Sequence, residues 1–114
     1  MPVKKQNPNR IDTLLQFLEE DPQDSFVRFA LAKEYEKLGT LKKAIDTLEE
    51  LKQMDKQYVG LYYHLGAMYV QTDDILTALT IYEEGINIAK KQADFHALSE
   101  LHTAKQNILL EDSE

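Results

Sequence analysis

Apolar residues recur three and four positions apart along most of the chain, which is the spacing of one face of an α-helix. The clearest stretch carries Leu41, Ala44, Ile45, Leu48 and Leu51, with lysine and glutamate at other positions. No stretch shows the strict alternation of a half-buried strand. The pattern therefore predicts an all-α fold of about six helices, over residues 9–20, 25–38, 41–54, 57–71, 74–90 and 94–110.

Residues that start or stop helices fall between these segments. Asp21 precedes Pro22, and a residue before proline avoids the helical conformation, so the first helix should end there. Ser25 is placed to cap the second helix, Gly39 to follow it in the left-handed conformation, and Thr40 to cap the third. We therefore expect short turns between the helices.

The chain resembles itself at an offset of 34 residues, the difference between positions 32 and 66. Small residues align with small ones, Ala32 with Gly66 and Ala44 with Ala78, and they let two helices approach closely. The larger aligned pairs are Leu31 with Leu65, Tyr35 with Tyr69, Ile45 with Leu79, Leu48 with Tyr82, and Glu49 and Glu50 with Glu83 and Glu84. We interpret each period as an antiparallel helical hairpin that stacks on its neighbour, because a lone hairpin cannot bury both faces.

This period and these positions resemble the tetratricopeptide repeat. The residues that carry the resemblance are Leu31, Ala32, Tyr35, Ala44 and Leu48 in the first repeat and Leu65, Gly66, Tyr69, Ala78 and Tyr82 in the second. The resemblance implies an α-solenoid of stacked hairpins that forms a single domain over residues 9–110. Its best repeats would be residues 25–58 and 59–92, with a capping helix at 94–110, after a flexible segment 1–8 and before an acidic tail 111–114.

Members of this family resemble adaptors that hold a peptide or a helix in a concave groove. The groove positions of the family correspond here to Phe26, Phe29, Lys33, Glu36 and Lys37, then Tyr63, Ala67, Val70 and Gln71, and finally His96, Glu100 and Thr103. An aromatic shelf of Phe29 and Tyr63 would hold an apolar anchor, and Lys33 and Lys37 would steer an acidic segment. The alternative is plain packing, in which Phe26 or Phe29 lies inside against the first helix.

One subclass of the family does not fit, namely the repeats that clamp the acidic C-termini of heat-shock chaperones. Such a clamp needs lysine or arginine and asparagine at fixed groove positions. Those positions hold Phe29, Lys33, His64, Ala93 and Ala97 in this chain. We therefore reject the carboxylate clamp as the binding mode.

Charge and composition exclude several other classes of protein. With 20 acidic and 13 basic side chains the net charge is −7, which repels a nucleic-acid backbone. The chain has no cysteine, so disulfides and thiolate metal sites are excluded. No apolar stretch reaches the roughly 20 residues of a membrane span, and no secretory leader is evident. We expect a cytoplasmic protein that needs no membrane, and the initiating methionine and short polar tail indicate a complete chain.

Catalysis finds little support among the residues. His96 and Glu100 are one helical turn apart, but two ligands do not make a metal site, and His102 lies too far round the helix to join them. The glycines are isolated, so no phosphate-binding loop is present. We expect a non-enzymatic protein without a cofactor or a bound metal, whose partner is a protein or peptide.

Self-assembly is the alternative function. The last predicted helix carries more apolar residues than one face can bury against its neighbour: Phe95, Leu98, Leu101, Ile108, Leu109 and Leu110. A homodimer through this helix would cover the excess. Leu101→Glu or Leu109→Glu would then shift the dimer to a monomer.

Overall fold

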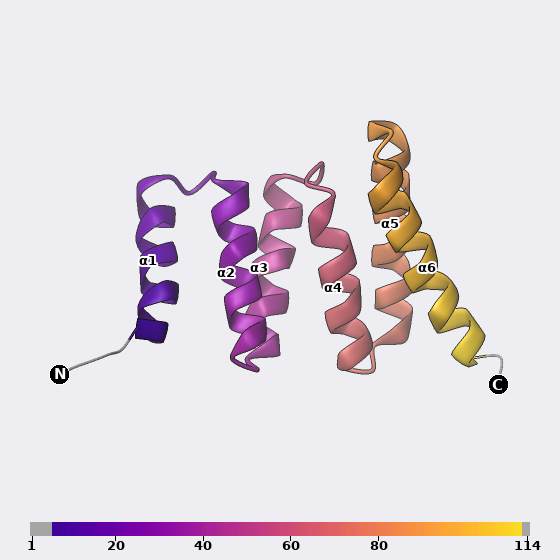
Figure 1. The fold of residues 1–114 in the computed structure, drawn as a ribbon, viewed down its shortest axis with the longest axis horizontal. Helices are drawn as coiled ribbons and strands as arrows, with labels where there is room; N and C mark the ends of the chain where they lie inside the picture. The colour runs from indigo at the N-terminus through magenta and orange to yellow at the C-terminus, as the bar shows by residue number, and fades with distance from the viewer. Residues whose placement is uncertain (1–5, 113–114) are drawn as a thin grey trace. The chain divides into compact units, whose positions relative to one another are not determined.

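The computed structural model describes the backbone of residues 6–112 and the side chains of residues 10–111. Within this range the chain forms six helices and no strand, so the predicted all-α fold is confirmed (Figure 1). The helices are α1 (Gln6–Glu20), α2 (Ser25–Lys37), α3 (Leu41–Met54), α4 (Gly60–Gln71), α5 (Ile75–Gln92) and α6 (Phe95–Asp112). The predicted properties of residues 1–5, 113 and 114 lie outside the described residues.

Four helix boundaries differ from the predicted ones by two or three residues, and one of them is the end of α5 at Gln92, two residues later than predicted. α1 begins at Gln6, so residues 6–8 are helical although a flexible segment was expected there. Pro8 lies in the first turn, where backbone N–H groups have no intrahelical partner, so the missing N–H of a proline costs the helix no hydrogen bond. α4 begins at Gly60, three residues later than predicted. α6 continues through Asp112, so the first two residues of the predicted acidic tail are also helical.

The prediction of Ser25 as the cap of α2 is wrong by one residue. Asp24 is the N-cap, and its side chain accepts a hydrogen bond of 3.0 Å from the backbone N–H of Val27. Ser25 is the first residue of the helix, and its hydroxyl donates to the carboxylate of Asp55 over 2.6 Å. Aspartate succeeds here because its carboxylate both accepts the N–H and carries a charge that the helix N-terminus favours.

Three helices end in the same way, with one residue in the left-handed conformation. This residue is Gly39 after α2 (φ 81°), Asp73 after α4 (φ 64°) and Ala93 after α5 (φ 56°). In each case its N–H and the next N–H donate back to carbonyls of the last helical turn, as the bonds from Thr40 to Tyr35 (3.1 Å), Asp74 to Tyr69 (2.9 Å) and Asp94 to Ala89 (3.0 Å) show. This pairing satisfies carbonyls that a helix end otherwise leaves unbonded.

The residue after each left-handed one starts the next helix. The side chains of Asp74 and Asp94 accept N–H hydrogen bonds from Thr77 and Ala97. Thr40 occupies the predicted position, but its hydroxyl instead donates to the carbonyl of Tyr35 over 2.9 Å. Asp74 and Asp94 therefore each take part in ending one helix and in starting the next. This double role produces the short turns that the sequence predicts.

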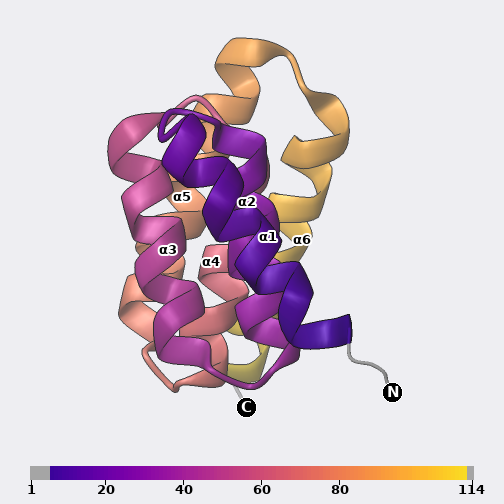
Figure 2. The same ribbon diagram turned by 90° about the vertical axis from the view of Figure 1, so that its left-hand side faces the viewer.

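The chain divides into two compact units, residues 1–56 and 57–114. In the first unit, α2 packs against both α1 and α3 (Figure 2). Ala32 and Ala44 are fully buried, as small residues at a close crossing of two helices should be. Leu14 is buried, whereas the neighbouring Leu15 is 41% exposed. The remaining core residues of this unit are Leu31, Thr47, Leu48 and Leu51.

In the second unit, α4, α5 and α6 pack against one another. Gly66 of α4 faces the ring of Tyr82, and Gly85 of α5 faces the Cβ of Tyr62, which would lie 2.5 Å from an added Cβ. The close crossing predicted at Gly66 is therefore present. The buried apolar residues of this unit are Leu61, Tyr62, Leu65, Met68, Ala78, Ile81, Tyr82, Ile86, Ala89, Leu101 and Ile108. The prediction of one domain over residues 9–110 stays a prediction.

Candidate functional site

A groove of about 540 Å³ runs between α4 and α6 in the second unit. Residues of α4 spaced four, seven and eight apart form one side, and a face of α6 spaced in the same helical manner forms the other. Tyr82 of α5 also lines the groove. The lining residues are Tyr63, Ala67, Val70, Gln71, Tyr82, Ser99, Glu100, Thr103, Ala104, Asn107, Ile108 and Glu111.

Tyr82 reaches the groove because Gly66 has no side chain. An added Cβ at Gly66 would lie 2.7 Å from two carbons of the Tyr82 ring, so the ring rests directly on the backbone of α4. Only 3% of Tyr82 is exposed. Burial, together with the nearby Tyr63, raises the pKa of the Tyr82 hydroxyl, which therefore stays protonated and able to donate.

Tyr82 lines the groove with a side chain that is apolar over its ring and polar at its hydroxyl. Among the described residues, the buried polar atom that lacks a hydrogen-bond partner is Nε of Arg28 in α2, and the Tyr82 hydroxyl is not one of these atoms. An occupant of the groove could therefore meet both the ring and the hydroxyl.

The charged side chains that line the groove are both acidic. Glu100 and Glu111 come from α6, and no lysine, arginine or histidine stands among the described lining residues. Uncharged polar groups of α4 and α6 lie between them, and Val70, Ala67, Ala104 and Ile108 add apolar surface. The groove is therefore apolar at its centre and negatively charged on one wall.

Sequence reasoning found part of this groove. Of the predicted residues, the structure brings together Tyr63, Ala67, Val70, Gln71, Glu100 and Thr103. His96 does not line the groove; its side chain is 86% exposed and its Nε2 lies 3.4 Å from the carboxylate of Glu100. Six lining residues were not predicted as part of a groove. Tyr82 was considered only as a position of the repeat. The others continue one face of α6 at helical spacing: Ser99, Ala104, Asn107, Ile108 and Glu111.

The other predicted groove residues belong to the first unit, on α2. Phe26 is 68% exposed, so the alternative that it packs inside against α1 is wrong. Phe29 is half-buried, and the ammonium of Lys33 lies 5.6 Å from the centre of its ring, within the range of a cation–π contact. Glu36 is half-buried and Lys37 is exposed.

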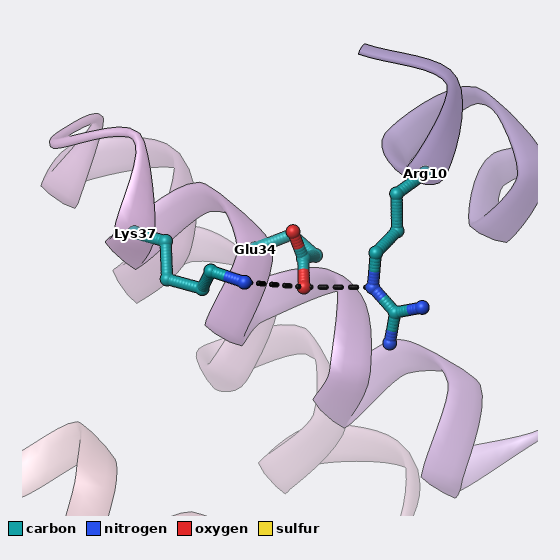
Figure 3. Close-up of polar contacts among 3 residues, drawn as sticks. All are labelled: Arg10, Glu34 and Lys37. Atoms are coloured by element: carbon teal, nitrogen blue, oxygen red, sulfur yellow. Dashed lines mark hydrogen bonds and ion pairs between the residues drawn. The ribbon is translucent and has the colours of Figure 1, made fainter. Parts of the chain in front are cut away.

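Lys37 is not a free cation for an acidic partner. Its Nζ lies 3.5 Å from Oε2 of Glu34, and the same oxygen accepts a 2.8 Å hydrogen bond from Nε of Arg10 in α1 (Figure 3). The Arg10 hydrogen bond, with help from Lys37, lowers the pKa of Glu34 against the opposing effect of burial. This cluster joins α1 to α2, and part of the positive charge predicted to steer a ligand is compensated by it.

Leu101 was predicted to take part in self-association, and the structure places its side chain in the core of the second unit. Leu101 is 1% exposed, and its Cδ1 would lie 3.1 Å from a Cβ added to Gly85 of α5. Leu109 is 41% exposed, and Phe95 and Leu110 are further exposed apolar residues of α6. Leu101 therefore belongs to the core of the second unit, and Leu109 remains accessible.

No group of three or more histidine, aspartate or glutamate side chains within the described part of the chain is arranged to hold a metal ion. Across residues 6–112, every helix is too short or too polar to span a bilayer.

The sequence matches the tetratricopeptide-repeat family over residues 27–58 and 59–92, which together cover more than half of the chain. These ranges coincide closely with the two periods found from the offset of the sequence against itself. No curated protein matches the chain.

Solved structures show the same fold. A tetratricopeptide repeat domain protein from Salinibacter ruber is 41% identical, with a TM-score of 0.73, over 76% of this chain and 88% of that one. The TPR2B domain of yeast Sti1, in a complex with pHsp70, has a TM-score of 0.84 at 14% identity and covers 92% and 84%. The type III secretion translocator chaperone SycD from Yersinia enterocolitica, an alternative dimer, has a TM-score of 0.85 at 17% identity and covers 95% and 83%. The matching repeats, the 34-residue period and the helical hairpins agree, and this chain belongs to the tetratricopeptide-repeat family.

Proposed function

We propose that this protein is a non-catalytic scaffold that binds a segment of another protein in the groove between α4 and α6. The observation that carries the proposal is the groove itself, which has a volume of about 540 Å³, is apolar at its centre and is lined by Tyr82. Apolar side chains beside it offer an anchor site, and polar side chains along α6 can bond to a backbone.

Two of the solved structures that share the fold are named for an interaction with another protein or for a chaperone role. The yeast Sti1 domain is recorded in a complex with pHsp70, and SycD is a translocator chaperone. Their low identity to this chain supports the fold alone, so the ligand must be argued from the residues of this chain. Since the clamp positions hold Phe29, Lys33, His64, Ala93 and Ala97, we do not propose the chaperone C-terminus as that ligand.

Filling the groove tests the proposal. Thr103 lines the groove and is exposed, so Thr103→Trp adds a large ring there without disturbing the core. Gln106 is exposed on the same helix and does not line the groove, so Gln106→Trp is the matched control. We expect the Thr103 variant to lose partners captured from cell extract and the Gln106 variant to keep them. Equal capture by both variants, at unchanged helix content, would contradict the groove.

Self-assembly through α6 is the second candidate, favoured by the exposure of Phe95, Leu109 and Leu110. Phe95 and Leu109 are fourteen positions apart, close to four helical turns, so they share a face. A dimer through this face would dissociate when Leu109 becomes glutamate, as light scattering over a dilution series can measure. A wild-type mass of 13.2 kDa at every concentration would exclude the dimer.

A further inference from the structure

We propose that the α4–α6 groove selects an extended segment with two basic side chains and an aliphatic residue between them. This inference rests on the proposed function and specifies the chemistry of its ligand. The charge of the groove, the geometry of α6 and the position of Tyr82 carry it.

The two carboxylates of the groove lie on one face of α6. Glu100 and Glu111 are eleven residues apart, close to three full turns of about 3.6 residues each. At about 1.5 Å per residue, this spacing separates their Cα atoms by roughly 16 Å along the helix. An occupant that lies along α6 therefore meets a negative charge near each end.

Neither carboxylate is neutralised by a lysine or arginine among the described residues. Glu111 has no ion pair there, and the side chain of Glu100 is 49% exposed beside the exposed His96. The nearby Lys105 is engaged with Glu83 over 2.6 Å, away from the groove. These carboxylates would attract basic side chains of a ligand and would repel an acidic segment.

Tyr82 adds a polar group that a polypeptide could use. It lines the groove, and its hydroxyl can donate to a backbone carbonyl or accept from a backbone amide of a bound segment. The neighbouring Val70 and Ile108 would contact an aliphatic side chain beside it.

An extended segment matches the spacing of the two carboxylates. An extended chain covers roughly 16 Å with about five residues, so it can place one basic side chain opposite each carboxylate. The basic side chains should therefore stand four to six positions apart.

Two capped hexapeptides test the proposal: one has lysine at both ends and leucine in the middle, and the other has glutamate in place of lysine. Titration followed by backbone amide NMR of the full chain should show the lysine peptide shifting Val70, Thr103, Ala104 and Asn107. We expect its affinity to fall about tenfold in the double variant Glu100→Gln/Glu111→Gln, since each exposed ion pair contributes modestly. We expect it to fall about threefold in Tyr82→Phe.

The matched control is Glu19→Gln/Glu20→Gln, which makes the same change of charge on the exposed face of α1. An equal loss of affinity in this control would overturn the proposal, because net charge alone would then explain binding. Equal or tighter binding of the glutamate peptide would also overturn it. Groove shifts that grow with protein concentration in the absence of peptide would assign the groove to a second copy and reject a basic segment.

The outcome separates this inference from the proposed function. If Thr103→Trp abolishes capture but the lysine peptide does not bind, the groove is a binding site for a ligand of other chemistry. If Thr103→Trp leaves capture unchanged, the groove itself is wrong as the binding site.

Discussion

The ring of Tyr82 occupies the space that Gly66 leaves on α4, and two ring carbons would lie 2.7 Å from an added Cβ. The corresponding pair in the first repeat, 34 positions earlier, is Ala32 with Leu48, and both are fully buried. A larger residue on one helix is thus matched by a smaller one on its partner. The exchange keeps the volume of the crossing and brings a tyrosine into the lining of the groove.

This relationship predicts coupled effects on stability. Gly66→Ala should cost about 1–2 kcal/mol, since overpacking outweighs the better helix propensity of alanine. The double variant Gly66→Ala/Tyr82→Leu reproduces the first repeat, so its loss should be smaller than the sum of the single losses by about 1 kcal/mol. Urea unfolding of the four proteins measures the coupling. Strictly additive losses would show that the two side chains do not share this space.

The residues in the left-handed conformation predict two substitutions with opposite effects on stability. Ala93 has φ 56°, a conformation in which a Cβ is unfavourable, so Ala93→Gly should stabilise the protein by about 0.5–1 kcal/mol. Gly39→Ala should destabilise it by about 1 kcal/mol, because φ is 81° although no atom lies within 4 Å of the added Cβ. Thermal unfolding measures both. A loss of stability in Ala93→Gly would show that this turn is not under strain.

The Arg10–Glu34 pair predicts a dependence of stability on pH. Its hydrogen bond lowers the pKa of Glu34 below 4.5, so the folded state favours the carboxylate more than the unfolded state does. The stabilisation is therefore present at pH values above 4.5 and is lost as the pH falls through the lowered pKa. Its size should be less than about 1 kcal/mol, because Arg10 is largely exposed and the pair is screened.

Urea unfolding of the wild type and Glu34→Gln at pH 7, 5, 4 and 3 isolates this contribution. The stability difference between the two proteins should shrink as the pH falls. The Glu83–Lys105 pair, which also lowers the pKa of Glu83, is present in both proteins and cancels in the comparison. A difference that stays constant across this range would contradict the assignment.

Leu101 and Leu109 predict different outcomes for the same substitution. Leu101→Glu places a charge in the core beside Gly85 and should cost about 3 kcal/mol or more, enough to unfold the second unit. Leu109→Glu should change the free energy of unfolding by less than about 1 kcal/mol, since the side chain is 41% exposed. Circular dichroism during thermal unfolding distinguishes the two. A folded Leu101→Glu protein of normal stability would contradict the burial of this residue.

The helices and the repeats could be predicted from the sequence because both are recorded in local spacing. Apolar residues three and four apart identify a helix, and a glycine such as Gly39 marks its end. The offset of 34 residues then relates Ala32 to Gly66 and Leu48 to Tyr82, which is enough to recognise the hairpins and the family. The N-cap of α2 was misplaced by one residue because Asp24 and Ser25 are both good caps.

The tertiary structure decided which face of each helix is buried. α6 carries apolar residues on several sides, so spacing alone could not show that Leu101 is core and Leu109 is accessible. It also decided the polar contacts between residues far apart in sequence, such as Arg10 with Glu34, and the meeting of Tyr82 with Glu100 and Glu111 at one groove. Helical spacing determines which side chains share a face, whereas the neighbours of that face depend on how the helices pack.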